Sequence, residues 1–281
     1  MASKQFDERL LKRLYRPVGG ASKSETGQVL VIGGSGLFHG APLLALKAAS
    51  RVAGMVYFAS PEPFLEKVAA EAKARLSAFI WVPWSEVEEY LEKADAVLMG
   101  PGFLRFRSEK QREACEKLGR CGAEAARTKK ISEDLLKKFA DKRWVIDAGS
   151  LQVMSAGLIP RGAILTPNDK EYRILFGDER EPAKKYDCVI VRKNNGVTVC
   201  SAEEKVEVKM GEAGMNKGGM GDVLAGLVVG LAAKNEPFLA AAAAAFVNQK
   251  AAENLHNRVG FVYNADDLAQ ETAEVLGTYW R

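Results

Sequence analysis

Residues 216–226 read Asn-Lys-Gly-Gly-Met-Gly-Asp-Val-Leu-Ala-Gly and lead into the longest apolar run of the chain, Val223–Ala233. Three glycines within four residues free the backbone, so that several N–H groups can point at one anion. A helix that follows adds the positive end of its dipole at the same place. The stretch therefore predicts an anion site at the start of a buried helix.

The chemistry expected at this helix start is phosphoryl transfer. The N–H groups of Gly219, Met220 and Gly221 would hold the charge of the transferring group. Asp222 would lie in the first helical turn and could accept a proton from an attacking hydroxyl. The alternative is a helix cap after a flexible loop, but a cap does not need this number of glycines.

Four short apolar runs upstream each end in a small or polar cluster. They are Val29–Ile32 before Gly33-Gly34-Ser35, Ala96–Met99 before Gly100-Pro101-Gly102, Trp144–Ile146 before Asp147, and Ile164–Leu165 before Thr166-Pro167-Asn168. Such runs, followed by turns and helical patterns, indicate parallel β-α units buried on both faces. Ligands bind beyond the carboxyl ends of such strands, so all four clusters should line one edge of the sheet.

The rest of the chain completes an α/β pattern. Helices are predicted over residues 41–51, 63–76, 86–93, 238–255 and 265–276, the last capped by Asn264, with two more in residues 108–142. Residues 188–192, 197–200 and 205–208 predict a strand and then a hairpin or meander with antiparallel strands at the sheet edge. One domain over residues 1–281 is expected, with two small domains as the alternative.

Composition excludes several classes of protein. Forty Lys and Arg against 36 Asp and Glu leave a net charge of +4, too small to argue for a nucleic-acid surface but compatible with a small anionic ligand. The longest apolar run has 11 residues, whereas a membrane span needs roughly 20. No targeting segment is apparent, so a cytoplasmic protein is expected. The cysteines (Cys115, Cys121, Cys188 and Cys200) lack zinc-site spacing and are expected to be structural thiols.

The glycine-rich loop at residues 33–41 follows a strand and precedes a helix. A dinucleotide fingerprint that begins at Gly34 would place His39 at the last glycine, and no P-loop Gly-Lys-Ser/Thr follows. The loop is therefore expected to form a substrate wall that includes Gly34 and Ser35, with His39 as an ordinary loop residue.

Taken in order, these pieces resemble the ADP/ATP-dependent NAD(P)H-hydrate dehydratases, a branch of the ribokinase-like, carbohydrate-kinase-related fold. The matching motifs are residues 29–35 with Gly40-Ala41, Gly100-Pro101-Gly102, Ile146-Asp147-Ala148, Leu165-Thr166-Pro167 with Glu171, and residues 218–226. The resemblance implies a three-layer α/β/α sandwich with a mainly parallel central sheet. It also implies an enzyme that phosphorylates the hydroxyl of hydrated NADH or NADPH (NADHX or NADPHX) with ADP or ATP and Mg²⁺, and then eliminates phosphate.

Site residues follow from the same resemblance. Asp222 is implied to be the base. The hydrate pocket is implied to include Ala41, Gly102 and Asn168. The adenine-nucleotide side corresponds to Lys193, Asn194, Asn195, Gly196, Val197 and Thr198, together with Gly221. Glu171 is a candidate for ordering Mg²⁺ on the phosphates. Two residues keep an alternative role. Asp147 would either orient substrate or a magnesium-bound water, or cap the next helix. Lys193 would either contact phosphate or lie in an exposed turn.

This chain departs from the family pattern at several positions. Relatives usually show T-P-H-P-G-E where residues 166–171 read T-P-N-D-K-E, and D-A-D where residues 147–149 read D-A-G. A K-G pair before the nucleotide-side threonine is replaced by Asn194-Asn195-Gly196, and Ser22-Lys23-Ser24 loosely matches S-H-K-G. Two other functions stay open: a small-molecule kinase of the same fold acting on a sugar, vitamin or pyrimidine alcohol, and a non-catalytic nucleotide-binding regulator.

The resemblance further implies a homo-oligomer, a tetramer or larger. Many relatives are fused to an NAD(P)H-hydrate epimerase domain, and the 281 residues leave no length for one. The epimerase is therefore expected as a separate functional partner.

Overall fold

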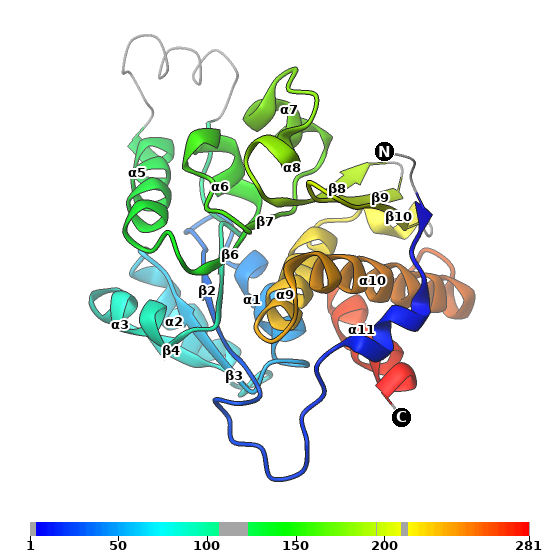
Figure 1. Cartoon of the computed structure of the whole chain (residues 1–281). Coiled ribbons are helices and arrows are strands. Elements are labelled where there is room, and N and C mark those ends of the chain that lie inside the picture. Colours follow the sequence, from blue (N-terminus) through cyan, green and yellow to red (C-terminus); the bar gives the residue numbers. More distant parts are fainter. Residues whose placement is uncertain (1–3, 107–122, 195, 209–212, 281) are drawn as a thin grey trace.

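The computed structural model describes residues 4–106, 123–194, 196–208 and 213–280 (Figure 1). Strands in these ranges form one sheet in the order β1-β10-β9-β8-β7-β6-β5-β2-β3-β4. Their bounds are β1 (Lys4–Gln5), β2 (Gln28–Ile32), β3 (Met55–Ala59), β4 (Ile80–Val82), β5 (Ala96–Met99), β6 (Arg143–Ile146), β7 (Ile164–Leu165), β8 (Val189–Asn194), β9 (Gly196–Cys200) and β10 (Lys205–Val208).

The α-helices include those predicted within the described residues and three more, between residues 148 and 185, for which no range was predicted. They are α1 (Gly40–Ala49), α2 (Phe64–Ala72), α3 (Val87–Lys93), α5 (Ala123–Lys138), α6 (Ala148–Val153), α7 (Asp169–Phe176), α8 (Pro182–Lys185), α9 (Met220–Ala232), α10 (Pro237–Val259) and α11 (Ala265–Trp280). Asn264 caps α11 as predicted, because its Oδ1 accepts from the N–H groups of Asp266 and Asp267. Of the two helices predicted within residues 108–142, α5 is one, and residues 107–122 lie outside the described part of the chain.

Pairing in the sheet confirms a mainly parallel architecture. Strands β8, β7, β6, β5, β2, β3 and β4 run parallel to one another, and β9 is antiparallel to both β8 and β10. The antiparallel part therefore lies towards one edge, as the sequence predicted. Strands β1, β3 and β4 were not predicted.

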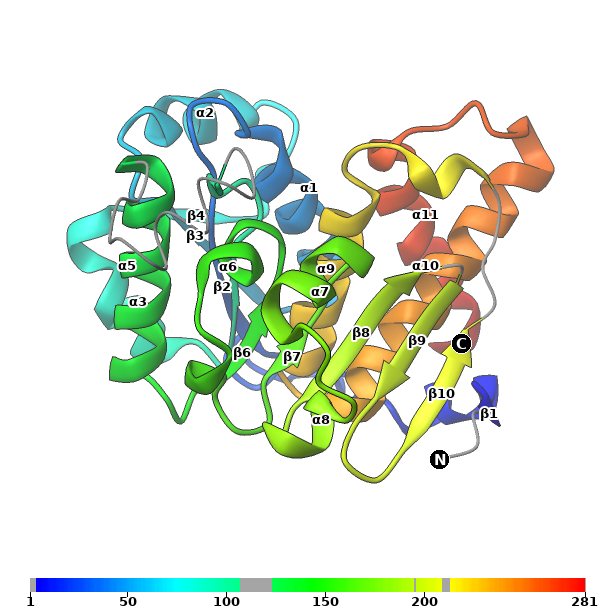
Figure 2. The ribbon, with the colours of Figure 1, turned by 90° about the horizontal axis from the view of Figure 1, so that it is seen from above.

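Two apolar cores lie on opposite faces of the sheet. Along β2, Val29 and Val31 pack into one core and Leu30 and Ile32 into the other, as alternating side chains of a doubly buried strand must. The first core is completed by α1, α2, α9, α10 and α11 and the second by α3, α5, α6, α7 and α8. Figures 1 and 2 show these helices on either side of the strands. The three-layer α/β/α sandwich is thus confirmed.

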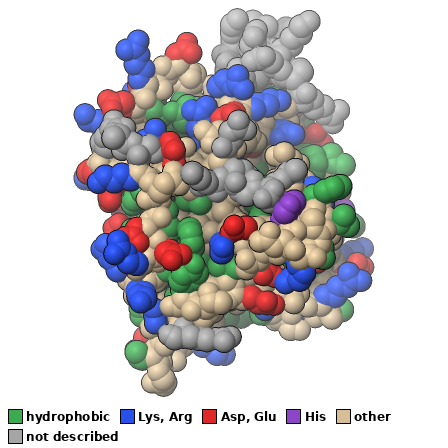
Figure 3. Space-filling model, turned by 90° about the vertical axis from the view of Figure 1, so that its right-hand side faces the viewer, with side chains coloured by type: hydrophobic (Ala, Val, Ile, Leu, Met, Phe, Trp, Pro, Cys, Tyr) green, Lys and Arg blue, Asp and Glu red, His purple; other side chains and the backbone are tan. Residues whose placement is uncertain are grey.

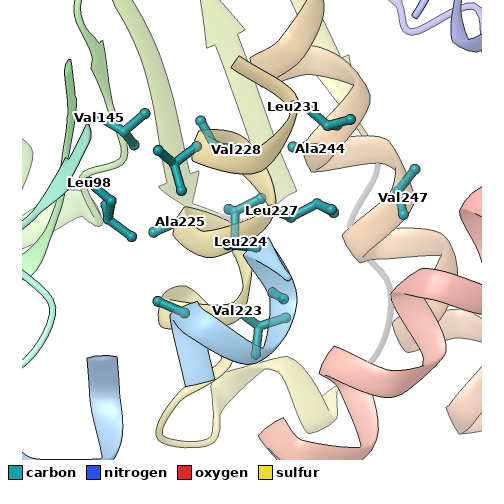
Figure 4. Packing of buried hydrophobic residues seen from close by; sticks show 14 of the residues in the cluster. Leu98, Val145, Val223, Leu224, Ala225, Leu227, Val228, Leu231, Ala244 and Val247 are labelled. Atoms are coloured by element: carbon teal, nitrogen blue, oxygen red, sulfur yellow. The ribbon is translucent and has the colours of Figure 1, made fainter. Parts of the chain in front are cut away.

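Helix α9 packs against the sheet at β5 and β6 and against the neighbouring helix α10. In Figure 4 it is flanked by the strand residues Leu98 and Val145 on one side and by Ala244 and Val247 of α10 on the other. All four side chains are fully buried. The helix that starts at the anion site is thereby fixed in position by packing on both sides.

Glycine lets α9 approach α1 closely. A Cβ atom on Gly226 would lie 2.2 Å from the carbonyl oxygen of Ala45 and 2.7 Å from its Cα. We predict that Gly226→Ala lowers the free energy of unfolding by about 2 to 4 kcal/mol, because the two backbones must separate. Urea unfolding measures this effect. Gly277→Ala in α11 is the matched control, since no atom lies within 4 Å of its added Cβ, and it should be neutral or stabilising. Equal effects of the two substitutions would contradict the prediction.

Surface charges are mixed on the face shown in Figure 3. Lys and Arg side chains alternate there with Asp and Glu among the described residues. Within the described ranges, none of the helices combines the length and apolar character that a transmembrane segment requires.

Candidate active site

The strand-end clusters meet at the carboxyl edge of the sheet. The N–H of Gly34, after β2, donates to the carbonyl of Pro101, after β5, at 2.8 Å. The hydroxyl of Thr166, after β7, donates to Asp147 Oδ1, after β6, at 2.7 Å. The expectation that these clusters share one edge is therefore confirmed.

The predicted substrate wall forms a tight corner next to α1. Gly34 (φ +89°) and Gly102 (φ +76°) adopt backbone conformations that favour glycine. A Cβ on Gly102 would lie 2.2 Å from the carbonyl oxygen of Phe38, and Pro42 lies within 3.3 Å of the Cβ positions of both glycines. Ala41 precedes that proline, so the structure brings Gly34, Gly102 and Ala41 together.

Ser35 and His39 belong to the same loop. The buried Ser35 hydroxyl accepts from the N–H of Phe38 at 3.0 Å, so it shapes the loop. His39 is exposed and precedes α1 without a side-chain cap, which agrees with an ordinary loop histidine.

Helix α9 begins with an uncapped glycine. Gly219, its N-cap residue, has φ +90° and no side chain to cap the helix. The N–H groups of a first turn have no partner within the helix itself and are available to an anion. A Cβ at Gly219 would lie 2.5 Å from Leu44 Cδ1 and 2.8 Å from Ala265 Cβ. The position therefore requires glycine for its conformation and for packing.

Lys193 connects the strand ends to the start of α9. Its Nζ donates to Asp147 Oδ1 at 3.0 Å, and a Cβ on Gly221 would lie 3.1 Å from the same nitrogen. The side chain is only 23% exposed, and Lys193 lies in β8 with its N–H donating to Pro167. The alternative of an exposed turn lysine is therefore wrong.

Asp222 is a carboxylate with a strongly perturbed pKa. Burial, together with the nearby Asp147 and Glu171 carboxylates, raises its pKa to about 7 against the opposing effect of the Lys193 ammonium. Near neutral pH the group exchanges a proton readily, which is the property of an effective general base. A pKa that is shifted by burial and by neighbouring charges together is also common among residues of functional sites.

The pKa values of Lys193 and Glu171 are set by burial and by the charges around them. Burial disfavours the Lys193 ammonium, but Asp147 and Glu171 outweigh it and raise the pKa of Lys193. Burial also raises the pKa of Glu171, against the attraction of Lys193. One ammonium group thus lies among three carboxyl groups, Asp147, Glu171 and Asp222.

Asp147 does not cap the helix that follows it. It occupies the N-cap position of α6 but makes no side-chain cap hydrogen bond there. Its Oδ1 instead accepts from Thr166 and Lys193. The capping alternative is therefore wrong, and the buried carboxylate faces the site.

Asn168 and Glu171 act together at the start of α7. They form a capping box in which Asn168 Oδ1 accepts from the Glu171 N–H at 2.9 Å and Glu171 Oε2 accepts from the Asn168 N–H at 2.9 Å. Gln152 Nε2 donates to Glu171 Oε1 at 3.0 Å. Both carboxylate oxygens of Glu171 are therefore already hydrogen-bonded within the protein.

The predicted nucleotide-side residues divide between the two faces of β8 and β9. Val197 pairs with Lys193 across the hairpin and belongs to the core beside α9 and α10. Asn194 and Thr198 instead line a hollow on the opposite face, and the hairpin closes through Gly196 at φ +136°. Asn195 lies outside the described residues. The structure thus gathers Lys193 and Gly221, but not Asn194 and Thr198, at the start of α9.

Two partners of the site were not predicted. Thr166 directly follows a predicted strand, as Asp147 does, and this shared position at a strand end was the signal for their contact. Gln152 follows Asp147 on α6, and no pattern in the sequence indicated that it would hold Glu171.

The described residues do not build a metal cage of their own, since no group of three or more His, Cys, Asp or Glu side chains among them could hold a metal ion. Mg²⁺ usually keeps several waters and binds through one or two carboxylates plus substrate phosphates. The carboxylates near Lys193 fit an ion of that kind, which would arrive with a nucleotide.

Comparison with known proteins decides the family. A family model described as NAD(P)H-hydrate dehydratase matches residues 29–274.

The chain belongs to the NAD(P)H-hydrate dehydratase family.

Two relatives illustrate its place in that family. The ADP-dependent (S)-NAD(P)H-hydrate dehydratase of Nitrosopumilus maritimus is 31% identical over 312 aligned positions, which cover 98% of each chain. The bifunctional NAD(P)H-hydrate repair enzyme Nnr of Methanocaldococcus jannaschii is 32% identical over 95% of this chain but only 51% of its own length. The chain therefore spans about half the length of the bifunctional relatives it matches.

Solved structures support the fold. The ADP/ATP-dependent NAD(P)H-hydrate dehydratase of Bacillus subtilis, co-crystallised with ATP/Mg²⁺, superposes with a TM-score of 0.72 at 21% identity and covers all of this chain and 98% of its own. A ribokinase-like superfamily protein of Enterococcus faecalis superposes with a TM-score of 0.76 at 20% identity, covering 99% and 96% of the two chains.

Proposed function

We propose that the chain, acting as a single domain, is a nucleotide-dependent NAD(P)H-hydrate dehydratase, a hydro-lyase that repairs hydrated NADH or NADPH. The observation that carries the proposal is the position of Asp222, with its pKa raised to about 7, in the first turn of α9 and close to Lys193. Membership of the dehydratase family supplies the substrate class.

In the first step, Asp222 takes the proton of the hydrate hydroxyl, and that oxygen attacks the terminal phosphorus of ADP or ATP. The new O–P bond forms as the bond to the bridging oxygen breaks, and the shortened nucleotide leaves. The N–H groups of Gly219, Met220 and Gly221 and the Lys193 ammonium balance the negative charge on the transferring group.

In the second step, the phosphorylated carbon loses phosphate. The C–O bond breaks and its electron pair leaves with the phosphate, the neighbouring carbon gives up a proton to the departing phosphate, and the double bond of the dihydronicotinamide ring is restored. Phosphate is a much better leaving group than hydroxide, which is why a nucleotide is consumed in a dehydration.

Substrate and metal have proposed places around this centre. Gly34, Ser35, Ala41 and Gly102 would form the wall beside the hydrate, with Asp147 and Asn168 at its polar end. Glu171 would order the water shell of Mg²⁺, which supplies charge neutralisation on the phosphates when bound. Lys193 and Gly221 are proposed for the phosphates of the nucleotide, whereas Asn194 and Thr198 lie on the opposite face of β8 and β9 and are not proposed for it.

The proposed function is tested by following the recovery of the dihydronicotinamide chromophore of NADH from its hydrate. The purified chain is incubated with hydrated NADH, Mg²⁺ and either ADP or ATP, and the near-ultraviolet absorbance of dihydronicotinamide is followed. We expect absorbance to return only when nucleotide is present. No return with either nucleotide would refute the dehydratase, and phosphorylation of an unrelated sugar or vitamin alcohol would establish the kinase alternative.

We predict that kcat/KM for the hydrate depends on pH through Asp222. The carboxylate must be unprotonated to act as a base, so with a pKa of about 7 the rate should rise tenfold per pH unit below pH 7 and level off above it. Initial rates between pH 5.5 and 9 measure this profile. A profile that stays flat down to pH 5.5 would show that the catalytic base has an ordinary carboxyl pKa.

Location and assembly are further proposals. Cys188 and Cys200 are free thiols, which supports a reducing, cytoplasmic setting.

A tetramer or larger homo-oligomer is supported by the exposed apolar side chains Leu37, Phe64, Phe261 and Val262, and light scattering tests it. The NAD(P)H-hydrate epimerase would act as a separate functional partner.

A further inference from the structure

The hollow lined by Asn194 and Thr198 lies on the face of β8, β9 and β10 that is turned away from α10. Figure 2 looks onto this face, with α7 and α8 at its side. The hollow encloses about 340 Å³, which is within the size range of small-molecule sites. Its lining combines side chains of β8 and β9 with those of the segment from Tyr172 to Lys184.

Positive charge dominates this lining. Arg180, Lys184, Arg192 and Lys205 contribute four cations, against the two carboxylates of Glu181 and Glu204. Among the described residues, Arg192 is the only one of the four cations in an ion pair. Thr198 and Ser201 add hydroxyl groups, which can donate to or accept from a polar ligand.

Two contacts hold the guanidinium group of Arg192 in a fixed orientation. Its Nε donates to Asp169 Oδ1 at 2.7 Å, and its guanidinium lies 4.3 Å from the centre of the Tyr172 ring. These two contacts fix the plane of the guanidinium, while its terminal nitrogens make no hydrogen bond among the described residues. A fixed guanidinium with free terminal donors suits the oxygens of a phosphate group.

The hollow is separate from the α9 site. Arg192 and Lys193 are consecutive in β8, so their side chains point to opposite faces of the sheet. Lys193 contacts Asp147 and approaches Gly221, whereas Arg192 faces the hollow. A ligand bound here would therefore not occupy the phosphoryl-transfer position.

We infer that this hollow is a binding site for a small phosphate ester of the sugar-phosphate class, distinct from the nucleotide site at α9. The phosphate would lie between Arg192 and the unpaired cations Arg180 and Lys205, and the sugar hydroxyls would contact Thr198 and Ser201. A concave site of this volume favours a small molecule over an acidic protein segment.

Calorimetric titration of the 281-residue chain with ribose 5-phosphate tests the inference. We expect saturable binding of ribose 5-phosphate and none of ribose. The double variant Arg180→Ala/Lys205→Ala should weaken binding at least tenfold, whereas the control Lys67→Ala/Lys73→Ala, which removes two exposed lysines from the region of α2, should not. Lys193→Met should also leave binding unchanged, because Lys193 faces the other side of β8.

Four results would overturn the inference. They are no binding of ribose 5-phosphate, unchanged affinity in Arg180→Ala/Lys205→Ala, loss of binding in Lys193→Met, and competitive displacement by ADP. The last two would place the ligand in the α9 site.

Discussion

Replacing Asp222 by Asn is expected to reduce turnover by about 10²- to 10⁴-fold while adenine-nucleotide binding is retained. Asparagine keeps the shape of the side chain and its place in the first turn of α9, but it cannot accept the hydroxyl proton. Nucleotide affinity should persist, because the N–H groups of the turn and Lys193 are unchanged. Rates of hydrate repair and calorimetric titration with ADP and ATP measure the two effects separately.

The same variant should be more stable than the parent protein above pH 7. The pKa of Asp222 is about 7 in the folded chain against 3.8 for an ordinary aspartate, so ionisation opposes folding. Below pH 3.8 Asp222 is protonated in both the folded and the unfolded chain, so it does not lower the free energy of unfolding. As the pH rises from 3.8 to about 7, the unfolded chain loses this proton first, and the free energy of unfolding falls. An asparagine at this position carries no such cost, and at pH 8 we expect a gain of about 2 to 4 kcal/mol.

Exposed Asp178 provides the control for both effects. Asp178→Asn should change neither turnover nor stability measurably. If Asp222→Asn retained full turnover, Asp222 would be no more than a helix-terminal carboxylate. If it lost turnover without any gain in stability at pH 8, the raised pKa would be refuted.

Replacing Lys193 by Met should weaken nucleotide binding by about 30- to 1000-fold. The ammonium group is the cation that contacts Asp147 and lies beside Gly221, and removal of one partner from a buried charged pair typically costs about 2 to 4 kcal/mol. Methionine keeps most of the aliphatic length, so loss of packing contributes little. Titration with ADP or ATP in the presence of Mg²⁺ measures the loss.

Lys193→Met should also move the pH dependence of the residual activity upwards. Lys193 lowers the pKa of Asp222, so in its absence the base needs a higher pH to ionise. Lys170→Met is the matched control, because Lys170 follows the neighbouring strand β7 but is exposed. Unchanged nucleotide affinity in Lys193→Met would show that the ammonium serves the fold and not the phosphates.

Much of the fold could be predicted from local patterns. Strands β2, β5, β6 and β7 are apolar runs that end in small or polar clusters, and this combination also located the carboxyl edge. Strand β3 was missed because a short, fully apolar run gives no alternation that separates a buried strand from a buried helix. The edge strand β4 has three residues, too few for any periodicity.

The site was predictable in its backbone but not in its side-chain pairing. Glycines around Asp222 indicated an anion site, because their conformational freedom is a property of the residue itself. The contacts of Asp147 with Thr166 and of Glu171 with Gln152 each join residues 19 positions apart, and they depend on which helices and strands become neighbours. The division of Lys193 and Thr198 between two faces depends on the register of the β8–β9 hairpin, which the unusual Asn194-Asn195-Gly196 sequence did not reveal.

A crystal structure of the chain with a non-hydrolysable ATP analogue and Mg²⁺ tests the central claim most directly. We predict that the terminal phosphate lies within hydrogen-bonding distance of N–H groups at Gly219 to Gly221 and of Lys193 Nζ, with the Asp222 carboxylate facing the space in front of the phosphorus. Phosphates bound elsewhere, or an Asp222 side chain directed away from them, would contradict the account.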